Sequence, residues 1–311
     1  MYLSREALDS LGITAREAAD AVESLIKRHA MKQAWAAPKV AITTPDGRYL
    51  NAMLAAADDP ALIMVKAAAL HPQNPEKGLP IINASITLLD SSTGQLIAVI
   101  DGNWVTAIRT AALSAVAALR LARTEPRSLA FIGCGVQAQS HLRIFSELFP
   151  LQEIRAFSRS RRSANILCRQ AAHLGLQTVI AQTAQTAMEA ADIVVSAVTM
   201  TPSLPPFIDA DWMQPGSLAI GTDMPTSWIY HKMKGFDRIY VDDSAQEAAL
   251  SSPLARNCLI FADLTDLVLG EKPGRTNDQE RLAFMFRGLS LADLALAALA
   301  YGKFQRLADG E

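Results

Sequence analysis

Residues Ser128 to Leu142 read SLAFIGCGVQAQSHL, and this stretch decides the fold class of the chain. Leu129–Ile132 is a short apolar run typical of a buried strand; Gly133 and Gly135 follow, and helix-forming residues continue to Leu148. A glycine turn between a strand and a helix lets the backbone approach a pyrophosphate closely, and the helix start then offers unpaired N–H groups. The pattern therefore predicts a dinucleotide-binding turn. Because GxGxxA is short enough to occur by chance, an ordinary tight turn without a ligand is the alternative.

Strands and helices alternate from this turn onward. The predicted strands are Leu129–Ile132, Ile154–Ser158, Thr178–Ala181, Ile193–Val198, Ser217–Ile220 and Arg238–Val241. This alternation predicts an α/β domain with a doubly wound parallel sheet. After Asp263 the pattern indicates helix to the end of the chain, and we expect the last helix to return to the first domain.

The N-terminal part of the chain has a different pattern. Thr14 and Glu17 have the spacing of a capping box, so a helix is predicted from there to about Ala34. Turn residues then separate short β-like runs at Val40–Ile42, Tyr49–Ala55, Leu62–Ala68, Ile81–Leu89 and Leu96–Ile100. These runs indicate an antiparallel or mixed sheet. The stretch Asn103–Ala122 is predicted to be one long helix that leads into the second domain.

Composition narrows the functional classes. The chain has 311 residues, half of them hydrophobic, which suggests about two domains with a sizeable core. A net charge of −2 favours neither nucleic acid nor an anionic membrane as a partner. Cys134, Cys168 and Cys258 lack metal-like spacing, so we expect free thiols in a reducing cytoplasm and no metal site. The N-terminus lacks the apolar core of a signal peptide, and no run reaches the roughly 18 apolar residues of a membrane span.

The end of the second predicted strand of the parallel sheet indicates which nucleotide is preferred. There the chain reads Ser158-Arg159-Ser160-Arg161-Arg162, without an acidic residue. An acid at this place would bond a ribose 2′-hydroxyl, whereas cationic and hydroxyl groups accept a 2′-phosphate. The sequence therefore predicts that NADP(H) is preferred, with NAD(H) possible. A solvated basic turn is the alternative.

Three cationic side chains are candidates for binding a substrate. Lys66 is the only charge in the apolar run Ala61–Leu70, and a lysine in a buried strand is costly without a partner. A strand-end lysine that reaches water along its stem is the alternative. Lys39 has a similar but weaker setting. Arg109 lies early in the long predicted helix, where a helix N-terminus favours anions such as a substrate carboxylate; a surface arginine is equally consistent.

Asp223 is a candidate for proton transfer. It follows the predicted strand Ser217–Ile220, at the sheet edge where ligands bind in open α/β folds. A carboxyl group there could exchange a proton with a substrate nitrogen if burial raised its pKa, and a turn or capping aspartate is the alternative. His71 and His141 have no metal-like partners nearby in the sequence and are interpreted as structural or loop residues.

Taken together, these stretches resemble the ornithine cyclodeaminase/mu-crystallin family over nearly the whole chain. The matching residues are Val65-Lys66, His71–Asn74, Thr93-Gly94, Val105–Ala112, Gly133–Ala138, Asp192–Ser196 and Gly221–Pro225. The resemblance implies a Rossmann-type NAD(P)-binding domain at residues 124–286. It implies a second, α+β domain for substrate binding and dimerisation, built from residues 1–123 and 287–311, and thus a homodimer.

The resemblance also implies residue roles. Lys66 and Arg109 match family residues that hold the substrate carboxylate, and Lys39 falls near a family arginine with the same role. A lysine there keeps the charge but loses the two-point geometry. Asp223 matches the catalytic aspartate of cyclodeaminases, which mu-crystallin-like members lack, and with Lys66 it is the catalytic candidate. The expected cofactor contacts are Thr110, Gly133, Gly135, Val136, Gln137, Ser158, Arg159, Ser160, Val198 and Thr199.

Two positions depart from the family pattern. Ile229 stands where members usually have a glutamate, and Phe286 lies in a segment where members tend to show Phe-Lys-Ser. Both departures bear on the identity of the substrate more than on cofactor binding.

The family chemistry is hydride transfer at a carbon that bears an amino or imino nitrogen. The basic turn after the second strand favours a net NADP(H)-dependent oxidoreductase acting on a small imino or amino acid: a cyclic ketimine such as pyrroline-2-carboxylate, or a 2-oxo acid plus an amine. Asp223 instead favours ornithine cyclodeaminase, an ammonia-lyase with internally recycled NAD. A third interpretation is a non-catalytic protein that binds NADPH and a ligand, which the presence of Lys66, Arg109 and Asp223 disfavours.

Overall fold

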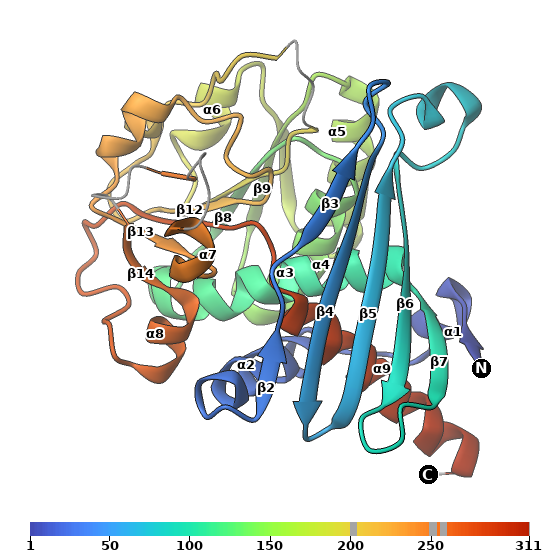
Figure 1. Ribbon diagram of the computed structural model, residues 1–311. Helices are drawn as coiled ribbons and strands as arrows, with labels where there is room; N and C mark the ends of the chain where they lie inside the picture. The colour runs from blue at the N-terminus through green and yellow to red at the C-terminus, as the bar shows by residue number, and fades with distance from the viewer. Residues whose placement is uncertain (200–203, 249–253, 256–259, 311) are drawn as a thin grey trace. The chain divides into compact units, whose positions relative to one another are not determined.

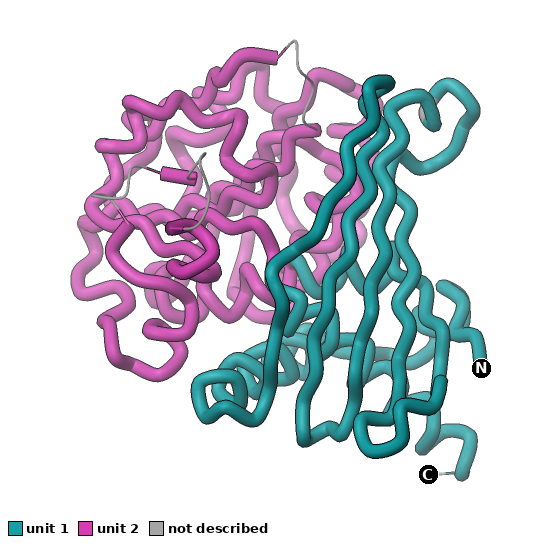
Figure 2. Tube along the Cα trace, in the orientation of Figure 1, with its two compact units in different colours: residues 1–110, 289–311 teal, residues 111–288 magenta. Residues whose placement is uncertain are grey.

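The computed structural model describes residues 1–199, 204–248, 254–255 and 260–310, which form two compact units (Figure 2). Unit 1 comprises Met1–Thr110 and Leu289–Glu311, and unit 2 comprises Ala111–Gly288. The division falls inside helix α3 (Gly102–Leu121), whereas the sequence places the boundary after residue 123. The second half of α3 therefore packs with unit 2.

Unit 1 contains a mixed sheet, as predicted, and its helices lie on one face of that sheet (Figure 1). Its strand order is β1-β7-β6-β5-β4-β2, and β3 also pairs with β4. The strands are β1 (Tyr2–Leu3), β2 (Ala34–Ala36), β3 (Val40–Thr43), β4 (Tyr49–Asp58), β5 (Ala61–Leu70), β6 (Ile82–Asp90) and β7 (Leu96–Asp101). All pairs are antiparallel except β1 with β7. Side chains along β5 alternate in burial, which turns Leu62, Met64 and Lys66 inward.

The helices of unit 1 are α1 (Arg5–Ser10), α2 (Ala15–Ala30), the 3₁₀ turn η1 (Asn74–Lys77), the first half of α3 and α9 (Ser290–Asp309). The capping box is confirmed: Thr14 accepts the Glu17 N–H, and the Glu17 carboxylate accepts the Thr14 N–H at 2.9 Å. Helix α2 ends at Ala30, before the predicted end, because Ala34–Ala36 pairs with β4 as a strand. Helix α9 packs against α2, β2, β4 and β5.

Unit 2 contains an all-parallel sheet of eight strands in the order β10-β9-β8-β11-β12-β15-β13-β14. The strands are β8 (Ser128–Ile132), β9 (Glu153–Phe157), β10 (Gln177–Ile180), β11 (Ile193–Ser196), β12 (Leu218–Gly221), β13 (Arg238–Val241), β14 (Ile260–Asp263) and β15 (Leu282–Met285). The helices are α4 (Val136–Leu148), α5 (Arg161–His173), α6 (Ala184–Met188), α7 (Ser244–Ala248) and α8 (Leu264–Leu269), with 3₁₀ turns η2 (Ala210–Trp212) and η3 (Tyr230–Gly235). The predicted doubly wound parallel sheet is confirmed.

The prediction of helix from Asp263 to the end of the chain is wrong. Leu282–Met285 forms β15, which lies between β12 and β13 in the sheet. All four residues of β15 are buried. A four-residue apolar run gives no periodicity by which a fully buried strand differs from a piece of buried helix.

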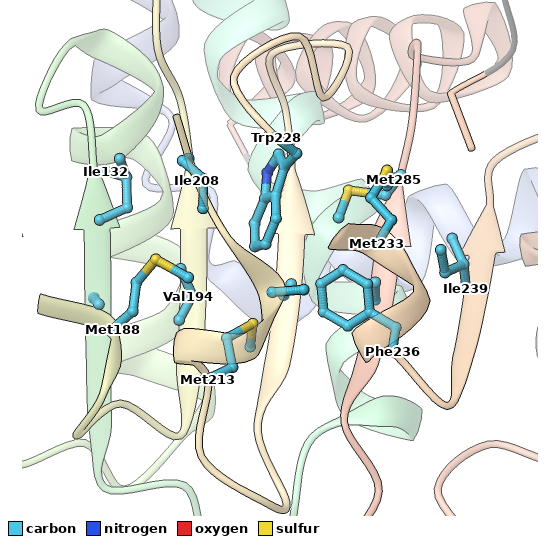
Figure 3. Close-up of a cluster of buried hydrophobic side chains, with 14 of the residues drawn as sticks. Ile132, Met188, Val194, Ile208, Met213, Trp228, Met233, Phe236, Ile239 and Met285 are labelled. Atoms are coloured by element: carbon cyan, nitrogen blue, oxygen red, sulfur yellow. The ribbon is translucent and has the colours of Figure 1, made fainter. Parts of the chain in front are cut away.

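One core cluster of unit 2 supports the loops at the carboxyl ends of the strands (Figure 3). It gathers side chains from β8, β11, β13 and β15 around the buried Trp228, whose ring lies 5.4 Å from that of Phe236. The Trp228 indole N–H donates to Ser196 Oγ at 2.8 Å. This large ring thus holds the loop after β12 against the end of β11.

Helix α3 is long and apolar enough, by length and composition, to cross a membrane. Of that stretch, 83% is buried inside the protein, which is typical of the core helix of a fold.

Candidate functional site

The glycine turn after β8 has the geometry of a phosphate-binding loop. Gly133 has a φ of +93°, and a Cβ there would lie 2.4 Å from the Ala197 carbonyl oxygen, so only glycine is tolerated. At Gly135 an added Cβ would meet no described atom within 4 Å. Gly135 is also the N-cap of α4 and makes no side-chain capping bond, which leaves the first N–H groups of the helix available. These features fit a bound pyrophosphate.

Other predicted cofactor residues lie at the same edge of the sheet. Strands β9, β8 and β11 are neighbours, so the loops that carry Ser158–Ser160, Gly133–Gln137 and Val198–Thr199 follow adjacent strand ends. Gln137 Oε1 is buried without a hydrogen-bond partner in the described chain, which leaves an acceptor for a ligand. Thr110 is buried on α3 in unit 1, where its hydroxyl donates to the Thr106 carbonyl at 2.7 Å.

The turn between β9 and α5 concentrates positive charge at a helix start. Ser160 caps α5 by accepting the Ser163 N–H at 3.3 Å. The arginines at this turn, Arg159, Arg161 and Arg162, are exposed, and none forms an ion pair with an acid in the described part of the chain. Cations at a helix N-terminus oppose the helix dipole, so this arrangement favours an anionic ligand.

Asp223 is buried and fully engaged in unit 2. Its Oδ1 accepts the Ser196 hydroxyl at 3.0 Å, and its Oδ2 accepts the Ser227 hydroxyl at 2.6 Å and the Val198 N–H at 3.2 Å. Burial raises the pKa of Asp223, although these three hydrogen bonds oppose the shift. Asp223 follows β12 as predicted, and it also ties the ends of β11 and β12 together.

Lys66 and Arg109 meet around a third residue, Asp293, in unit 1. Lys66 Nζ donates to Asp293 Oδ1 at 2.6 Å, and Arg109 Nε lies 3.1 Å from the same oxygen. All three are buried: Lys66 is 2% exposed, Arg109 is 7% exposed and Asp293 is 0% exposed. They come from β5, α3 and α9. We call Lys66, Arg109 and Asp293 the buried ion triad.

Burial and charge set the ionisation of the triad. Burial, and after it the nearby charge of Arg109, lower the pKa of Lys66 to about 8, against the attraction of Asp293. Burial alone would raise the pKa of Asp293, but Arg109, Lys66 and, more weakly, Lys39 together hold it below its usual value. Lys39, half-buried before β3, is thus within electrostatic range of the triad.

Two interpretations from the sequence need correction or completion. Arg109 is the eighth residue of α3, so it lies beyond the first turn, where the helix dipole acts, and its charged neighbour in the structure is Asp293. Asp293 was not predicted as a site residue. The signal for it was a lone charge within the apolar stretch Leu291–Ala300, the same signal that singled out Lys66.

The two histidines differ in setting. His141 is fully buried in unit 2 between the Gln137 carbonyl and the Ser114 hydroxyl, and burial lowers its pKa to about 4, so it is a neutral structural residue. His71 is half-buried at the end of β5. No group of three or more potential ligands that could hold a metal occurs among the described residues, and Cys258 lies outside them.

A family model, ornithine cyclodeaminase/mu-crystallin family, matches residues 1–307. The chain belongs to this family. It is 33% identical to alanine dehydrogenase of Archaeoglobus fulgidus, over 97% of this chain and 94% of that protein. It is 31% identical to ketimine reductase mu-crystallin of Mus musculus, over 81% of this chain and 80% of that protein.

Solved structures agree with this assignment. The fold matches Δ1-pyrroline-2-carboxylate reductase of Thermococcus litoralis, solved with NADH and L-proline, with a TM-score of 0.90, 27% identity and coverage of 100% and 98% of the two chains. It matches an archaeal alanine dehydrogenase dimer with bound NAD with a TM-score of 0.88, 28% identity and coverage of 100% and 97%. The ornithine cyclodeaminase/mu-crystallin family is thus one of NAD(P)-dependent amino-acid dehydrogenases and imine reductases, and this chain is an enzyme of that family.

The two positions that depart from the family pattern lie in unit 2, one half-buried and one buried. Ile229 is half-buried, and its N–H donates to the Ile208 carbonyl at 2.8 Å. Phe286 is buried, with its ring stacked on that of Phe284 at 5.0 Å.

Proposed function

We propose that this protein is an NADP(H)-dependent oxidoreductase that reduces the C=N carbon of a small imino acid. The substrate is a cyclic ketimine such as pyrroline-2-carboxylate, or the imine formed from a 2-oxo acid and an amine. The observation that carries the proposal is the buried ion triad. Two cations and one carboxylate leave one positive unit of charge in a site with little access to water, and an anion of the substrate would neutralise it.

A carboxylate suits the groups that the triad leaves available. Arg109 uses Nε toward Asp293, so its two terminal nitrogens can donate two parallel hydrogen bonds to a planar carboxylate. Lys66 adds a third donor, and Lys39 adds charge nearby. Holding the carboxylate at several points would orient the neighbouring C=N bond, which is worth several kcal/mol of the barrier in well-positioned reactions.

We propose that Asp223 delivers the proton that the imine nitrogen needs when it becomes an amine. Burial raises the pKa of this carboxyl group, and a carboxyl group with a raised pKa can hold and release a proton nearer to neutral pH. Bound NADPH supplies the hydride.

The preference for NADP(H) over NAD(H) rests on the turn after β9. Ser158, Arg159 and Ser160 follow the strand, and three exposed arginines surround the start of α5. A 2′-phosphate would pair with these guanidinium groups and with the helix N-terminus. The similar structures named above hold NADH or NAD, so this preference is argued from the residues of this chain alone.

Asp223 also favours a second candidate, ornithine cyclodeaminase, in which NAD is reduced and reoxidised within one turnover. The two functions differ in their products. Net loss of NADPH with an imino acid supports the reductase, and proline plus ammonia from ornithine without net cofactor change supports the lyase. Binding of NADPH without either reaction would support a non-catalytic binding protein.

The open face of the unit 1 sheet supports a homodimer. The helices cover one face, while Ile42, Leu50 and Leu54 lie exposed on the other, with Ile42 opposite Leu50 on neighbouring strands (Figure 1). Large apolar side chains gathered on a sheet face mark an interaction surface. We propose that a second copy of the chain covers it, as expected for a relative of the archaeal alanine dehydrogenase dimer. The free thiols of Cys134 and Cys168 suit the proposed cytoplasmic location.

The function is tested by substitutions in the triad. Lys66→Ala and Arg109→Ala should each lower kcat/KM for pyrroline-2-carboxylate by about 100-fold, because a buried charge-assisted bond to the carboxylate is lost. The Kd for NADPH should stay within about twofold, since the nucleotide contacts proposed above lie mainly in unit 2. Steady-state NADPH oxidation and fluorescence titration give the two quantities.

Arg28→Ala is the matched control, because Arg28 pairs with the exposed Asp59 on the surface of the same unit. It should leave both quantities unchanged. Unaltered kcat/KM in both Lys66→Ala and Arg109→Ala would remove the triad from the substrate site.

A further inference from the structure

We propose that Asp293 is the positioning residue of the carboxylate site: its Oδ1 holds Lys66 and Arg109 together as a charged pair that accepts one anionic carboxylate. This inference rests on the proposed function and adds to it a residue from the C-terminal helix α9.

The geometry places a single oxygen at the centre of the site. Asp293 Oδ1 lies 2.6 Å from Lys66 Nζ and 3.1 Å from Arg109 Nε. The contact with Arg109 does not meet hydrogen-bond geometry, since Arg109 Nε has no hydrogen-bond partner in the described chain. Asp293 Oδ2 likewise lacks a partner there. Asp293 therefore holds Lys66 by a hydrogen bond and Arg109 by electrostatic attraction alone. The guanidinium group of Arg109 is thus able to reorient toward a ligand.

The charges explain why the site needs Asp293. Lys66 and Arg109 are nearly inaccessible to water, and two buried cations side by side repel each other and lose their hydration. The charged groups that face Lys66 are Asp293 from α9 and Arg109 from α3, while Lys39 acts on Asp293 from the segment before β3. Of these, Asp293 alone favours the protonated form of Lys66.

The consequence is a dependence on pH. With Asp293 present the pKa of Lys66 is about 8, so the amine is mostly charged at pH 7 and loses its proton as the pH rises through 8. Without the carboxylate the pKa of Lys66 falls further, so a smaller share of the amine is charged at pH 7. A neutral amine binds a carboxylate less well than an ammonium group does.

The test compares the wild type with Asp293→Asn, which preserves shape and removes charge. At pH 7 we expect KM for pyrroline-2-carboxylate to rise about tenfold or more, with a smaller change in kcat. The basic limb of the kcat/KM profile, near pH 8 in the wild type, should move at least about one pH unit lower. Asp293→Glu keeps the negative charge, so the basic limb of its kcat/KM profile should lie closer to the wild-type pH than that of Asp293→Asn.

Asp192→Asn is the matched control. Asp192 is also a buried carboxylate bonded to an arginine, Arg123, but it belongs to unit 2, whereas the three triad residues belong to unit 1. It should lower the melting temperature without moving the basic limb. If Asp293→Asn leaves the limb where the wild type has it, the inference is overturned.

Two further measurements keep the test decisive. Lys66→Arg replaces the amine by a group that stays charged, so the basic limb should disappear even if Asp293→Asn fails to fold. NMR titration of the Lys66 side chain, in wild type and Asp293→Asn without substrate, reads the same pKa change. If the wild type does not reduce the imino acid but NMR shows a lower Lys66 pKa in Asp293→Asn, only the proposed function is contradicted. If the wild type is active but the Lys66 pKa is the same in both proteins, only the role of Asp293 is contradicted.

Discussion

At the scale of single residues, two glycines of one turn should behave differently. Gly133→Ala places a side chain at a φ of +93° and against the Ala197 carbonyl, so it should lower the free energy of unfolding by about 2 kcal/mol or more. Gly135→Ala points a methyl group into open space, so stability should change by less than about 1 kcal/mol. That methyl group would occupy the place proposed for the pyrophosphate, so the Kd for NADPH should rise about tenfold or more.

Chemical denaturation and NADPH titration of both variants measure these effects, and each variant controls for the other. Equal NADPH affinity in Gly135→Ala and the wild type would show that no phosphate group rests on this turn.

The site residues show how far a single sequence leads. Lys66 was predictable because a lone charge in an apolar strand requires a partner. The partner, Asp293, lies 227 positions away in the chain, and no local pattern connects the two. The sequence predicts an anion site at Arg109 from the dipole of its helix, whereas in the structure Arg109 lies beyond the first turn and 3.1 Å from Asp293 Oδ1. Contacts between residues far apart in the chain depend on tertiary structure, so the local periodicity of the sequence does not predict them.

At the scale of elements, the β9–α5 turn should set the nucleotide preference. Arg159→Asp replaces the group that we propose to pair with a 2′-phosphate by one that would repel a phosphate and can bond a ribose hydroxyl. The ratio of kcat/KM with NADPH to that with NADH should fall about tenfold or more. Arg169→Asp makes the same charge change on the exposed side of α5, away from its start, and should leave the ratio nearly unchanged. A wild-type enzyme that turns over faster with NADH at equal concentration would contradict the assignment.

Most elements were predictable from local pattern, and the exceptions share a cause. Strands bounded by clear turns, such as Arg238–Val241, agree with the sequence to the residue. The sequence predicts helix for the apolar run Leu282–Met285, although this run is a central strand buried on both faces. A fully buried element has no polar side to mark its period, so neighbouring strands rather than its own residues determine its form.

At the scale of the whole molecule, the open sheet face should hold two copies together. A double substitution, Ile42→Glu with Leu54→Lys, places charges on two exposed apolar positions of β3 and β4. Desolvating these charges on association costs several kcal/mol, so light scattering should show a monomer where the wild type is a dimer. Leu307→Lys changes an exposed leucine of α9 and should leave the mass unchanged. A wild type that is monomeric at micromolar concentration would contradict the dimer.

The proposed nucleotide site and the proposed carboxylate site lie in different units. Unit 2 contains the helix start and the basic turn that we propose for the nucleotide, and unit 1 contains the buried ion triad that we propose for the substrate carboxylate. The general architecture was predictable because a change from period-two runs to alternating strands and helices is a strong local signal.

The most direct test of the account is a crystal structure with NADPH and pyrrole-2-carboxylate, a flat analogue of the cyclic imino acid. The account predicts a carboxylate oxygen within about 3 Å of Lys66 Nζ and another at the terminal nitrogens of Arg109. It would be contradicted by a carboxylate bound elsewhere, with Lys66 and Arg109 still contacting only Asp293.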